Sequence, residues 1–374
     1  IASGKIKEAK YTFSSDALGV KTTWTAAELG VTSVDNSAAE KASDAFKKEM
    51  AVDLSPAVNA LLADLPYDLY WYDKTTGYAT SLQYSYRFNA SSVTINSVSF
   101  VMYFAVSQNY LTGSYSTYAA NGKTYPLTLN SIPSRVTTAA AKARSIVSKY
   151  ASSSDLDKLK GYKQEICDLV SYNTAAASNK STAYGDPWQL IYVFDGVNTT
   201  NVVCEGYAKA FQYLCDLTSF KSSQIECFSV TGTMTGGTGA GEHMWNIVHM
   251  DDGKNYLVDI TNSDTGTIGA SDYLFLKGYS SGGYNSSYTF KCGYSGSISF
   301  TYDSLARSQF TTEELTLSNT DYDPSNAVPD TVKGDVNGDG KANGLDAALI
   351  LKSLVGSYSL SGYSAADAAA ILKG

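Results

Sequence analysis

The sequence predicts an α+β fold in which helices pack on an antiparallel sheet. Apolar residues recur at helical spacing over residues 134–150, 156–172 and 204–215. From about residue 225 to 302, the pattern changes to short strands with glycine-rich connections. Helices that come first and antiparallel strands that follow indicate a domain whose helical and sheet layers are segregated.

Residues 1–135 are predicted to form an N-terminal extension of helices followed by tyrosine-rich strands. Helical spacing and then alternation predict two helices and a strand pair, at residues 38–50, 56–65, 80–88 and 93–104. The second helix has Pro56 in its first turn, where a missing N–H is tolerated. The tyrosines could line a groove for sugar or peptide, but their strand preference favours half-buried positions in a sheet.

Composition limits the classes of function. The chain has 374 residues, 44% of them hydrophobic and 17% charged, and its net charge is −8, which allows two or more domains. An acidic chain without a basic stripe is not expected to bind nucleic acid. No apolar run reaches the roughly 18–20 residues of a membrane span. The first residues resemble a trimmed mature start rather than a signal peptide, and the low-charge, hydroxyl-rich composition is typical of secreted bacterial proteins.

Five cysteines and two histidines restrict where a nucleophilic site can lie. An odd number of cysteines leaves at least one unpaired in a secreted protein. Cys204 follows a polar loop and stands near the first turn of a helix with one apolar stripe. Unpaired backbone N–H groups and the positive end of the helix dipole favour the thiolate there. The alternative is a small buried hydrophobic residue, which is a common role for cysteine.

A predicted hairpin brings a histidine and a carboxylate together. Two strands flank residues 251–253, whose sequence Asp-Asp-Gly suits a type I turn with a bulge at the glycine. This turn pairs Trp245 with Asp259, so His243 and Asp259 become diagonal neighbours on one face, roughly 7–8 Å apart at Cα. The aspartate can then orient the imidazole while the other ring nitrogen serves a thiol. A two-residue turn would place them on opposite faces, and His249, beside the turn, is expected to have only a structural role.

The end of the chain predicts a linker and a small calcium module. Residues 316–333 lack periodicity and contain two prolines, which is typical of a linker. Residues 335–346 then match an EF-hand-type loop better than an ordinary turn rich in Asp, Asn and Gly. The oxygen ligands, including one backbone carbonyl from the lysine, are expected from Asp335, Asn337, Asp339, Lys341 and Asp346. A short helix over 347–355 should follow, and the segment 346–352 recurs as 367–373.

Three motifs resemble the bacterial transglutaminase-like superfamily of cysteine peptidases and transglutaminases. They are Cys-Glu-Gly-Tyr-Ala at 204–208, His-Met-Trp-Asn-Ile-Val at 243–248, and Gly-Lys-Asn-Tyr-Leu-Val-Asp-Ile-Thr at 253–261. Their order and spacing agree with the family, so the resemblance implies a papain/transglutaminase-like core over residues 136–315. It also implies that Cys204 is the nucleophile, that His243 is the general base and then acid, and that Asp259 orients the imidazole.

The resemblance further implies donors for an oxyanion. The backbone N–H of Cys204 is one candidate. Papain-like relatives add an upstream side chain, which Gln189 or Trp188 could supply here, although Trp188 could equally serve in packing. The family often has tryptophan after its Val-Asp-x-Thr motif, where this chain has Asn262. We expect that change to reshape the acceptor side of the cleft.

The terminal module resembles a dockerin, which binds enzymes to the cohesins of a cellulosomal scaffoldin. Dockerins commonly carry aspartate at the last loop position, as Asp346 does here. The second half has Gly356, Tyr358 and Leu360 at the equivalent positions 1, 3 and 5, so one Ca²⁺ is expected rather than two. The resemblance implies a small all-α module over residues 334–374, a cohesin partner, and a location outside the cell at a cellulosome or cell surface.

Together these features predict a secreted, cellulosome-attached cysteine peptidase that acts on protein or peptide substrates. It would cleave peptide or isopeptide bonds through an acyl-enzyme, without a catalytic cofactor. Hydrolysis is favoured because water is the default acceptor and no amine site is visible. One alternative is transglutaminase-type crosslinking of proteins. The other is a non-catalytic module whose tyrosine-rich extension binds polysaccharide or protein.

Overall fold

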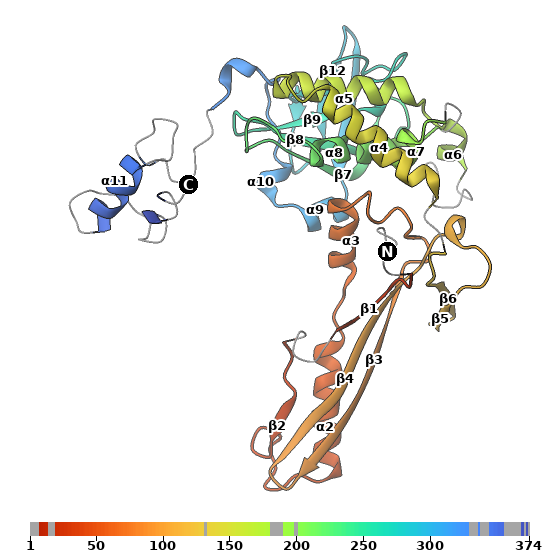
Figure 1. Ribbon diagram of the computed structural model, residues 1–374, viewed down its shortest axis with the longest axis vertical. Coiled ribbons are helices and arrows are strands. Elements are labelled where there is room, and N and C mark those ends of the chain that lie inside the picture. Colours follow the sequence, from red (N-terminus) through yellow and green to blue (C-terminus); the bar gives the residue numbers. More distant parts are fainter. Residues whose placement is uncertain are drawn as a thin grey trace.

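A seven-stranded antiparallel sheet lies in the upper body of the protein, above the long arm (Figure 1). The computed structural model describes residues 7–13, 19–130, 133–179, 190–197, 201–328, 336, 344–354, 368–369 and 372. The strand order is β10-β9-β8-β7-β13-β12-β11, and helices precede and cover the sheet, so the predicted α+β class is confirmed. In that order the strands are Phe275–Lys277, Asn255–Val258, Gly241–His249, Glu226–Thr235, Gly296–Tyr302, Tyr288–Cys292 and Ser281–Gly282.

Helix α8 (Cys204–Asp216) packs against the middle of this sheet, on β7 and β8. Three further helices contact its other side: α4 (Ser134–Lys149), α5 (Asp155–Leu169) and α7 (Ile191–Phe194). Every residue from Glu205 to Cys215 is therefore buried. The sequence predicted a single buried stripe, and the difference arises because the helix lies between two layers. Smaller helices are formed at Thr174–Ser178 (α6), Ser304–Gln309 (α9) and Thr312–Leu315 (α10), and α9 contacts β7 and β13.

The N-terminal extension forms a long arm built on one hairpin (Figure 1). Its strands, β3 (Tyr78–Asn89) and β4 (Ser92–Phe104), pair from Asn89 with Ser92 onward. Helix α2 packs along both strands, and α3 returns to the core. The predicted helices and strand pair are confirmed. The other elements of the extension are β1 (Lys10–Phe13), β2 (Thr23–Thr25), α2 (Asn36–Met50), α3 (Ser55–Asp64), η1 (Gln108–Tyr110), β5 (Thr117–Ala120) and β6 (Lys123–Pro126).

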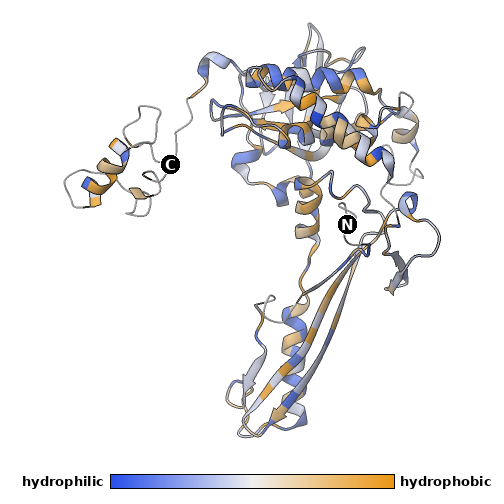
Figure 2. Ribbon diagram, in the orientation of Figure 1, coloured by the Kyte–Doolittle hydropathy of each residue, from blue (hydrophilic) through white to orange (hydrophobic). Residues whose placement is uncertain are grey.

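The extension and the helical layer share one hydrophobic cluster. Phe46 and Tyr70 of the extension belong to the same set of packed, buried side chains as Tyr162 and Phe211. Colouring by hydropathy shows α3 as a largely hydrophobic helix where it meets the core (Figure 2). A second cluster, around Trp245, lies on the sheet. The boundary near residue 135 is therefore a change of sequence pattern within continuous packing.

The described part of the predicted linker lies along the sheet. Leu317 forms a parallel bridge with Asn255, and the Asp321 carboxylate accepts hydrogen bonds from Lys277 and the Gly278 N–H at 2.6 and 3.1 Å. The Val328 N–H donates to the Asp251 carbonyl at 2.6 Å. Backbone pairing of this kind needs no hydrophobic period, so the sequence pattern did not reveal it. A short η4 turn is formed at Pro324–Asn326.

The terminal module is described only in part, through helix α11 (Gly344–Leu354) and four single residues. The Asp346 carboxylate is fully buried and accepts a hydrogen bond from the Val336 N–H at 3.0 Å. Ala347 and Ala368, which occupy equivalent positions in the two repeats, share a small buried cluster with Ile350. The other four predicted calcium ligands, Asp335, Asn337, Asp339 and Lys341, lie outside the described residues.

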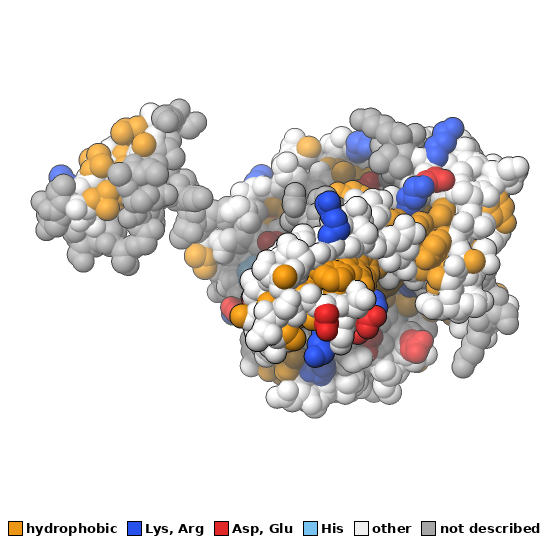
Figure 3. Space-filling view, turned by 90° about the horizontal axis from the view of Figure 1, so that it is seen from below, with side chains coloured by type: hydrophobic (Ala, Val, Ile, Leu, Met, Phe, Trp, Pro, Cys, Tyr) orange, Lys and Arg blue, Asp and Glu red, His pale blue; other side chains and the backbone are white. Residues whose placement is uncertain are grey.

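Surface charge is scattered on the face seen from the tip of the arm (Figure 3). Basic and acidic side chains occur there in small separate groups, and that face carries no continuous basic patch. Within the described residues, no helix is long and apolar enough to cross a membrane.

Candidate active site

Cys204 is the first residue of helix α8. The N-cap residue, Val203, is extended and its side chain makes no capping hydrogen bond. The N–H groups of the first turn therefore receive no side-chain acceptor from the N-cap position. Cys204 is half-buried, whereas Cys215 at the other end of the helix is buried. Burial raises the pKa of Cys167 to about 12 and that of Cys227 well above its usual value, which keeps both as thiols.

The β8–β9 hairpin has the predicted register. The Met250 N–H donates to the Lys254 carbonyl at 2.9 Å, and Gly253 adopts a φ of 73°, which a side chain would strain. Asn246 pairs with Val258. In this antiparallel register, the next residue, Asp259, comes opposite Trp245, as predicted. His243 Nε2 and Asp259 Oδ2 are 3.0 Å apart, and both side chains are almost completely buried. The predicted meeting of these two residues is therefore present in the structure.

Asn262 holds the Asp259 carboxylate in place. Its side-chain nitrogen donates to Asp259 Oδ2 at 2.8 Å, and its backbone N–H donates to Oδ1 at 3.2 Å. Its side-chain oxygen accepts from the Thr238 N–H at 2.7 Å. Asn262 is fully buried, so it supports Asp259 from beneath instead of reshaping a cleft surface. Sequence reasoning noticed Asn262 as a departure from the family but missed this role, because the chain turns into a 3-10 helix (η3, Thr261–Ser263) after β9.

The His243 ring lies against an apolar wall. It stacks on Trp245 with ring centroids 6.1 Å apart, and Phe300 lies 6.0 Å away. Burial alone would favour the neutral ring, but Asp259 and Cys204 outweigh it and raise the pKa of His243 to about 10. Nδ1 is buried and makes no hydrogen bond within the described part of the chain. That nitrogen is therefore the ring atom available to the Cys204 thiol. In catalytic pairs, the hydrogen bond between nucleophile and base often tightens only when substrate binds.

Tyr172 borders the site from the helical side. Its backbone forms a bridge with Val202, two residues before Cys204. Burial, followed by the charges of Cys204 and Asp259, raises the pKa of the phenol, so it remains a hydrogen-bond donor. A Cβ added to Gly239 would stand 2.4 Å from the phenol oxygen. The glycine-rich loop after β7 can therefore approach Tyr172 only because it lacks a side chain here.

The predicted side-chain donors for an oxyanion, Gln189 and Trp188, lie outside the described residues. The backbone N–H of Cys204 stays a predicted donor. Within the described residues, no three His, Cys, Asp or Glu side chains form a group that could hold a metal ion.

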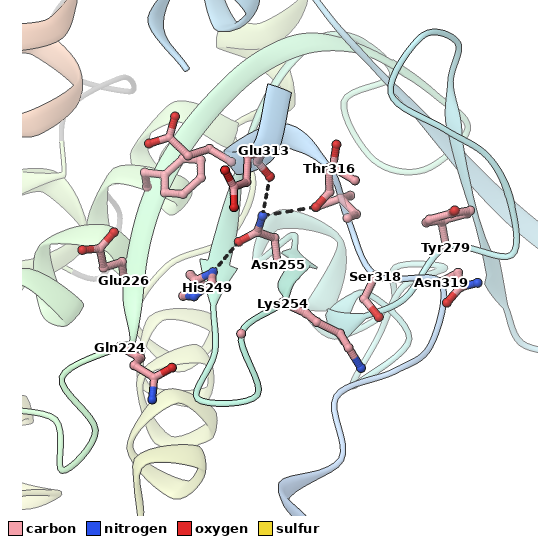
Figure 4. A pocket seen from close by; sticks show the side chains of 14 residues that line it. Gln224, Glu226, His249, Lys254, Asn255, Tyr279, Glu313, Thr316, Ser318 and Asn319 are labelled. Carbon is pink, nitrogen blue, oxygen red and sulfur yellow. Dashed lines mark hydrogen bonds between the residues drawn. The ribbon is translucent and has the colours of Figure 1, made fainter. Parts of the chain in front are cut away.

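A cavity of about 900 Å³ lies at the turn end of the same hairpin (Figure 4). His249 Nδ1 is 2.7 Å from the side-chain oxygen of Asn255. The amide nitrogen of Asn255 donates to the carbonyls of Glu313 and Thr316 at 2.9 and 3.2 Å. His249 thus helps Asn255 to fasten the C-terminal segment to the hairpin, in agreement with the structural role that the sequence predicted.

Comparison with known proteins adds little to this geometry. No family model matches the chain, and no curated protein matches it. One solved structure, "Crystal structure of a TGase", aligns with 57% of this chain at 17% identity and a TM-score of 0.28. The alignment spans half the length of that protein. A likeness of this size carries no argument, so function must be argued from the site itself.

Proposed function

We propose that this protein is a cysteine peptidase or acyl transferase of the transglutaminase-like type, with Cys204 as nucleophile, His243 as general base and acid, and Asp259 as orienting carboxylate. The observation that carries the proposal is the buried 3.0 Å contact between His243 Nε2 and Asp259. It leaves Nδ1 for a half-buried cysteine at a helix start. A carboxylate that is itself held by Asn262 can fix the orientation of the imidazole, as a catalytic histidine needs.

The chemistry follows from these positions. The Cys204 thiolate adds to a carbonyl carbon, and the tetrahedral oxyanion collapses with cleavage of the C–N bond. The proton on His243 Nδ1 passes to the leaving nitrogen. In the second half, water gives a proton to Nδ1 and adds to the thioester, the C–S bond breaks, and the thiolate is restored. Asp259 orients the ring and stabilises the imidazolium.

Hydrolysis of peptide or isopeptide bonds is the proposed outcome, because water needs no binding site of its own. Transfer to an amine, as in protein crosslinking, uses the same acyl-enzyme and differs only in the acceptor. The site therefore supports acyl transfer as a class, and the acceptor is decided by experiment. A purely binding role is disfavoured because it would need neither a half-buried cysteine at a helix start nor a buried ring nitrogen left for it.

The first test is brief iodoacetamide labelling at pH 7, followed by mass spectrometry of each cysteine. Cys204 should label much faster than Cys167 and Cys227, which are also half-buried but have raised pKa values. Equal labelling rates would remove the main support for an activated nucleophile. Denatured casein with and without a dansylated alkylamine then separates the acceptors: new N-termini indicate hydrolysis, and a dansyl label indicates transfer. The Cys204→Ala variant should do neither.

We further propose that the terminal module is a calcium-dependent dockerin that attaches the enzyme to a cohesin outside the cell. Its ligands would be Asp335, Asn337, Asp339, Asp346 and the Lys341 carbonyl. When bound, the ion would order the loop. The buried Asp346 carboxylate, already turned toward the loop backbone at Val336, fits this role. The packing of Ala347 with Ala368 supports a duplicated module.

Cohesin binding gives the test of this attachment. A panel of immobilised cohesins should retain the full chain in millimolar CaCl₂ and release it in EDTA. Retention that is equal in both buffers would contradict a calcium-dependent contact. The Asp346→Ala variant should behave in calcium as the native chain does in EDTA, while Cys204 labelling stays unchanged.

A further inference from the structure

Two cysteines meet where the end of helix α8 packs on strand β7. Cys215 is the next-to-last residue of the helix, and Cys227 is the second residue of the strand. Cys215 is buried within the main hydrophobic cluster, and the half-buried Cys227 packs against that cluster. Burial, and then a hydrogen bond with the Cys215 thiol, raise the pKa of Cys227 well above its usual value. The two thiols are therefore direct neighbours in the reduced protein.

The packing of α8 on β7 explains why these cysteines meet. Ser229 Oγ donates to Gln212 Oε1 at 2.7 Å, and both side chains are buried. Cys215 lies three residues after Gln212, on the same side of the helix. Cys227 lies two residues before Ser229, on the same face of the strand. The hydrogen bond and the two thiols are thus successive contacts between one helix and one strand.

The other three cysteines have different surroundings. The thiols of Cys167 and Cys292 are directed at backbone carbonyls, at 3.9 and 4.0 Å, and Cys204 is the proposed nucleophile. Cys215 lies at the opposite end of α8 from Cys204, so its contact with Cys227 has no part in the triad. Two neighbouring thiols on separate elements are the arrangement from which a disulfide forms without rearrangement of the fold.

We propose that Cys215 and Cys227 form a disulfide bond when the protein folds in an oxidising compartment, and that this bond fastens the end of α8 to the sheet. The oxidant is a disulfide, RSSR, such as oxidised glutathione. One cysteine thiolate attacks RSSR, forms a mixed disulfide and releases one RSH. The second thiolate then displaces another RSH, so RSSR accepts both electrons and both protons. The inference goes beyond the proposed function, because it does not require Cys204 to be a nucleophile.

The surroundings of Cys227 determine when the bond can form. In the folded, reduced protein the raised pKa keeps Cys227 as a thiol at neutral pH, and a thiol reacts slowly with a disulfide. During folding both cysteines are still accessible, so the bond is expected to close as α8 docks on β7. It then encloses the short loop of residues 216–226. Such a closed loop restricts the unfolded chain and so stabilises the folded one.

The test is refolding of the full chain from urea and reductant into oxidised and reduced glutathione at pH 8. Free thiols are then alkylated, the chain is digested without reductant, and the peptides are analysed by mass spectrometry. One linked species should join the peptides of Cys215 and Cys227 and should disappear on reduction. The oxidised chain should also unfold about 5–10 °C above the reduced chain. Finding both cysteines alkylated, or either one linked to a different cysteine, would overturn the inference.

Matched variants provide the controls. Cys227→Ser should lose the linked peptides and unfold at the same temperature in both redox states. Cys292→Ser, which removes a buried cysteine of the sheet, should keep the linked peptides and the temperature difference. Cys204→Ala should form the same bond. Should Cys227→Ser not fold, the linked peptides of the native chain decide the question.

Two other results have separate meanings. A linked native chain that unfolds at the same temperature as the reduced chain would contradict the fastening of α8. In the reduced chain, the labelling rates of Cys204 and Cys227 can still be compared. Equal rates there would refute the proposed function and leave the disulfide standing, so the two failures can be told apart.

Discussion

Replacing Asp259 by asparagine should separate the charge of the triad from its shape. Asparagine keeps the size of the side chain and one acceptor oxygen, but it removes the anion 3.0 Å from His243. The pKa of His243 is about 10 in the folded protein against about 6.5 in an unfolded chain. That difference corresponds to about 5 kcal/mol in favour of the charged ring, at 1.36 kcal/mol per pKa unit. Without Asp259, burial dominates and the ring should be neutral at pH 7.

Both catalysis and stability should then change in a defined direction. Acyl-enzyme formation at pH 7 should fall roughly 100- to 10,000-fold. The pKa of His243 is raised in the folded state, so the charged ring stabilises the fold fully below about pH 6.5, and this is lost as the pH rises through about 10. The Asp259→Asn variant should therefore lose about 2–3 kcal/mol at pH 6, less than the full amount because a neutral ring can still bond the amide.

The assay pairs urea unfolding at pH 6 and pH 10 with the rate of Cys204 alkylation. The native chain and the variant should differ in stability at pH 6 and converge at pH 10. Asp252→Asn is the matched control, since it removes a carboxylate from the turn of the same hairpin, where Tyr256 donates to it at 2.6 Å. An equal loss of stability at both pH values, with native alkylation rates at pH 6, would refute the ion-pair reasoning.

Two further substitutions test parts of the structure that the motifs do not contain. Asn262→Ala removes the side-chain bonds to Asp259 and to the Thr238 N–H, so kcat/KM should fall about 10- to 100-fold, while Cys204→Ala remains the inactive reference. Asp216 ends helix α8 near Asp64, and partial desolvation together with that neighbouring charge raises its pKa to about 7. Because the side chain is exposed, Asp216→Asn should stabilise the protein by only about 0.5–1 kcal/mol above pH 7. Near pH 3, where the native carboxyl is protonated, it should not change the stability. Calorimetry at the two pH values measures the difference.

The hairpin shows what local sequence can predict about this site. A three-residue turn that ends in glycine determines the register of two strands, and the register determines which side chains share a face. His243 and Asp259 could therefore be paired from residues 251–253 alone, and the structure has that pairing. The start of α8 at Cys204 could also be predicted, because helical periodicity is a local property of the sequence.

The contacts that sequence could not predict join residues far apart in the chain. Glu205 has the helical spacing of a surface residue, but it is buried and pairs with Lys209 of the same helix and with Lys74 of the distant extension. The segment after residue 316 was read as a linker because its bonds to Asn255 and Asp251 use backbone groups, which leave no pattern in the side chains. Asn262 supports Asp259 through a turn whose direction the strand pattern does not determine.

The position of α8 explains why these distant contacts exist. A helix enclosed by a sheet and by other helices has no solvent-facing side on which charged residues can be placed. A charged residue in the middle of this helix must therefore be buried, and a buried charge needs partners. Lys209 supplies one partner from the same helix, and the extension supplies the other through Lys74. Enclosing the helix of Cys204 in this way joins it to the arm, which shares its hydrophobic cluster.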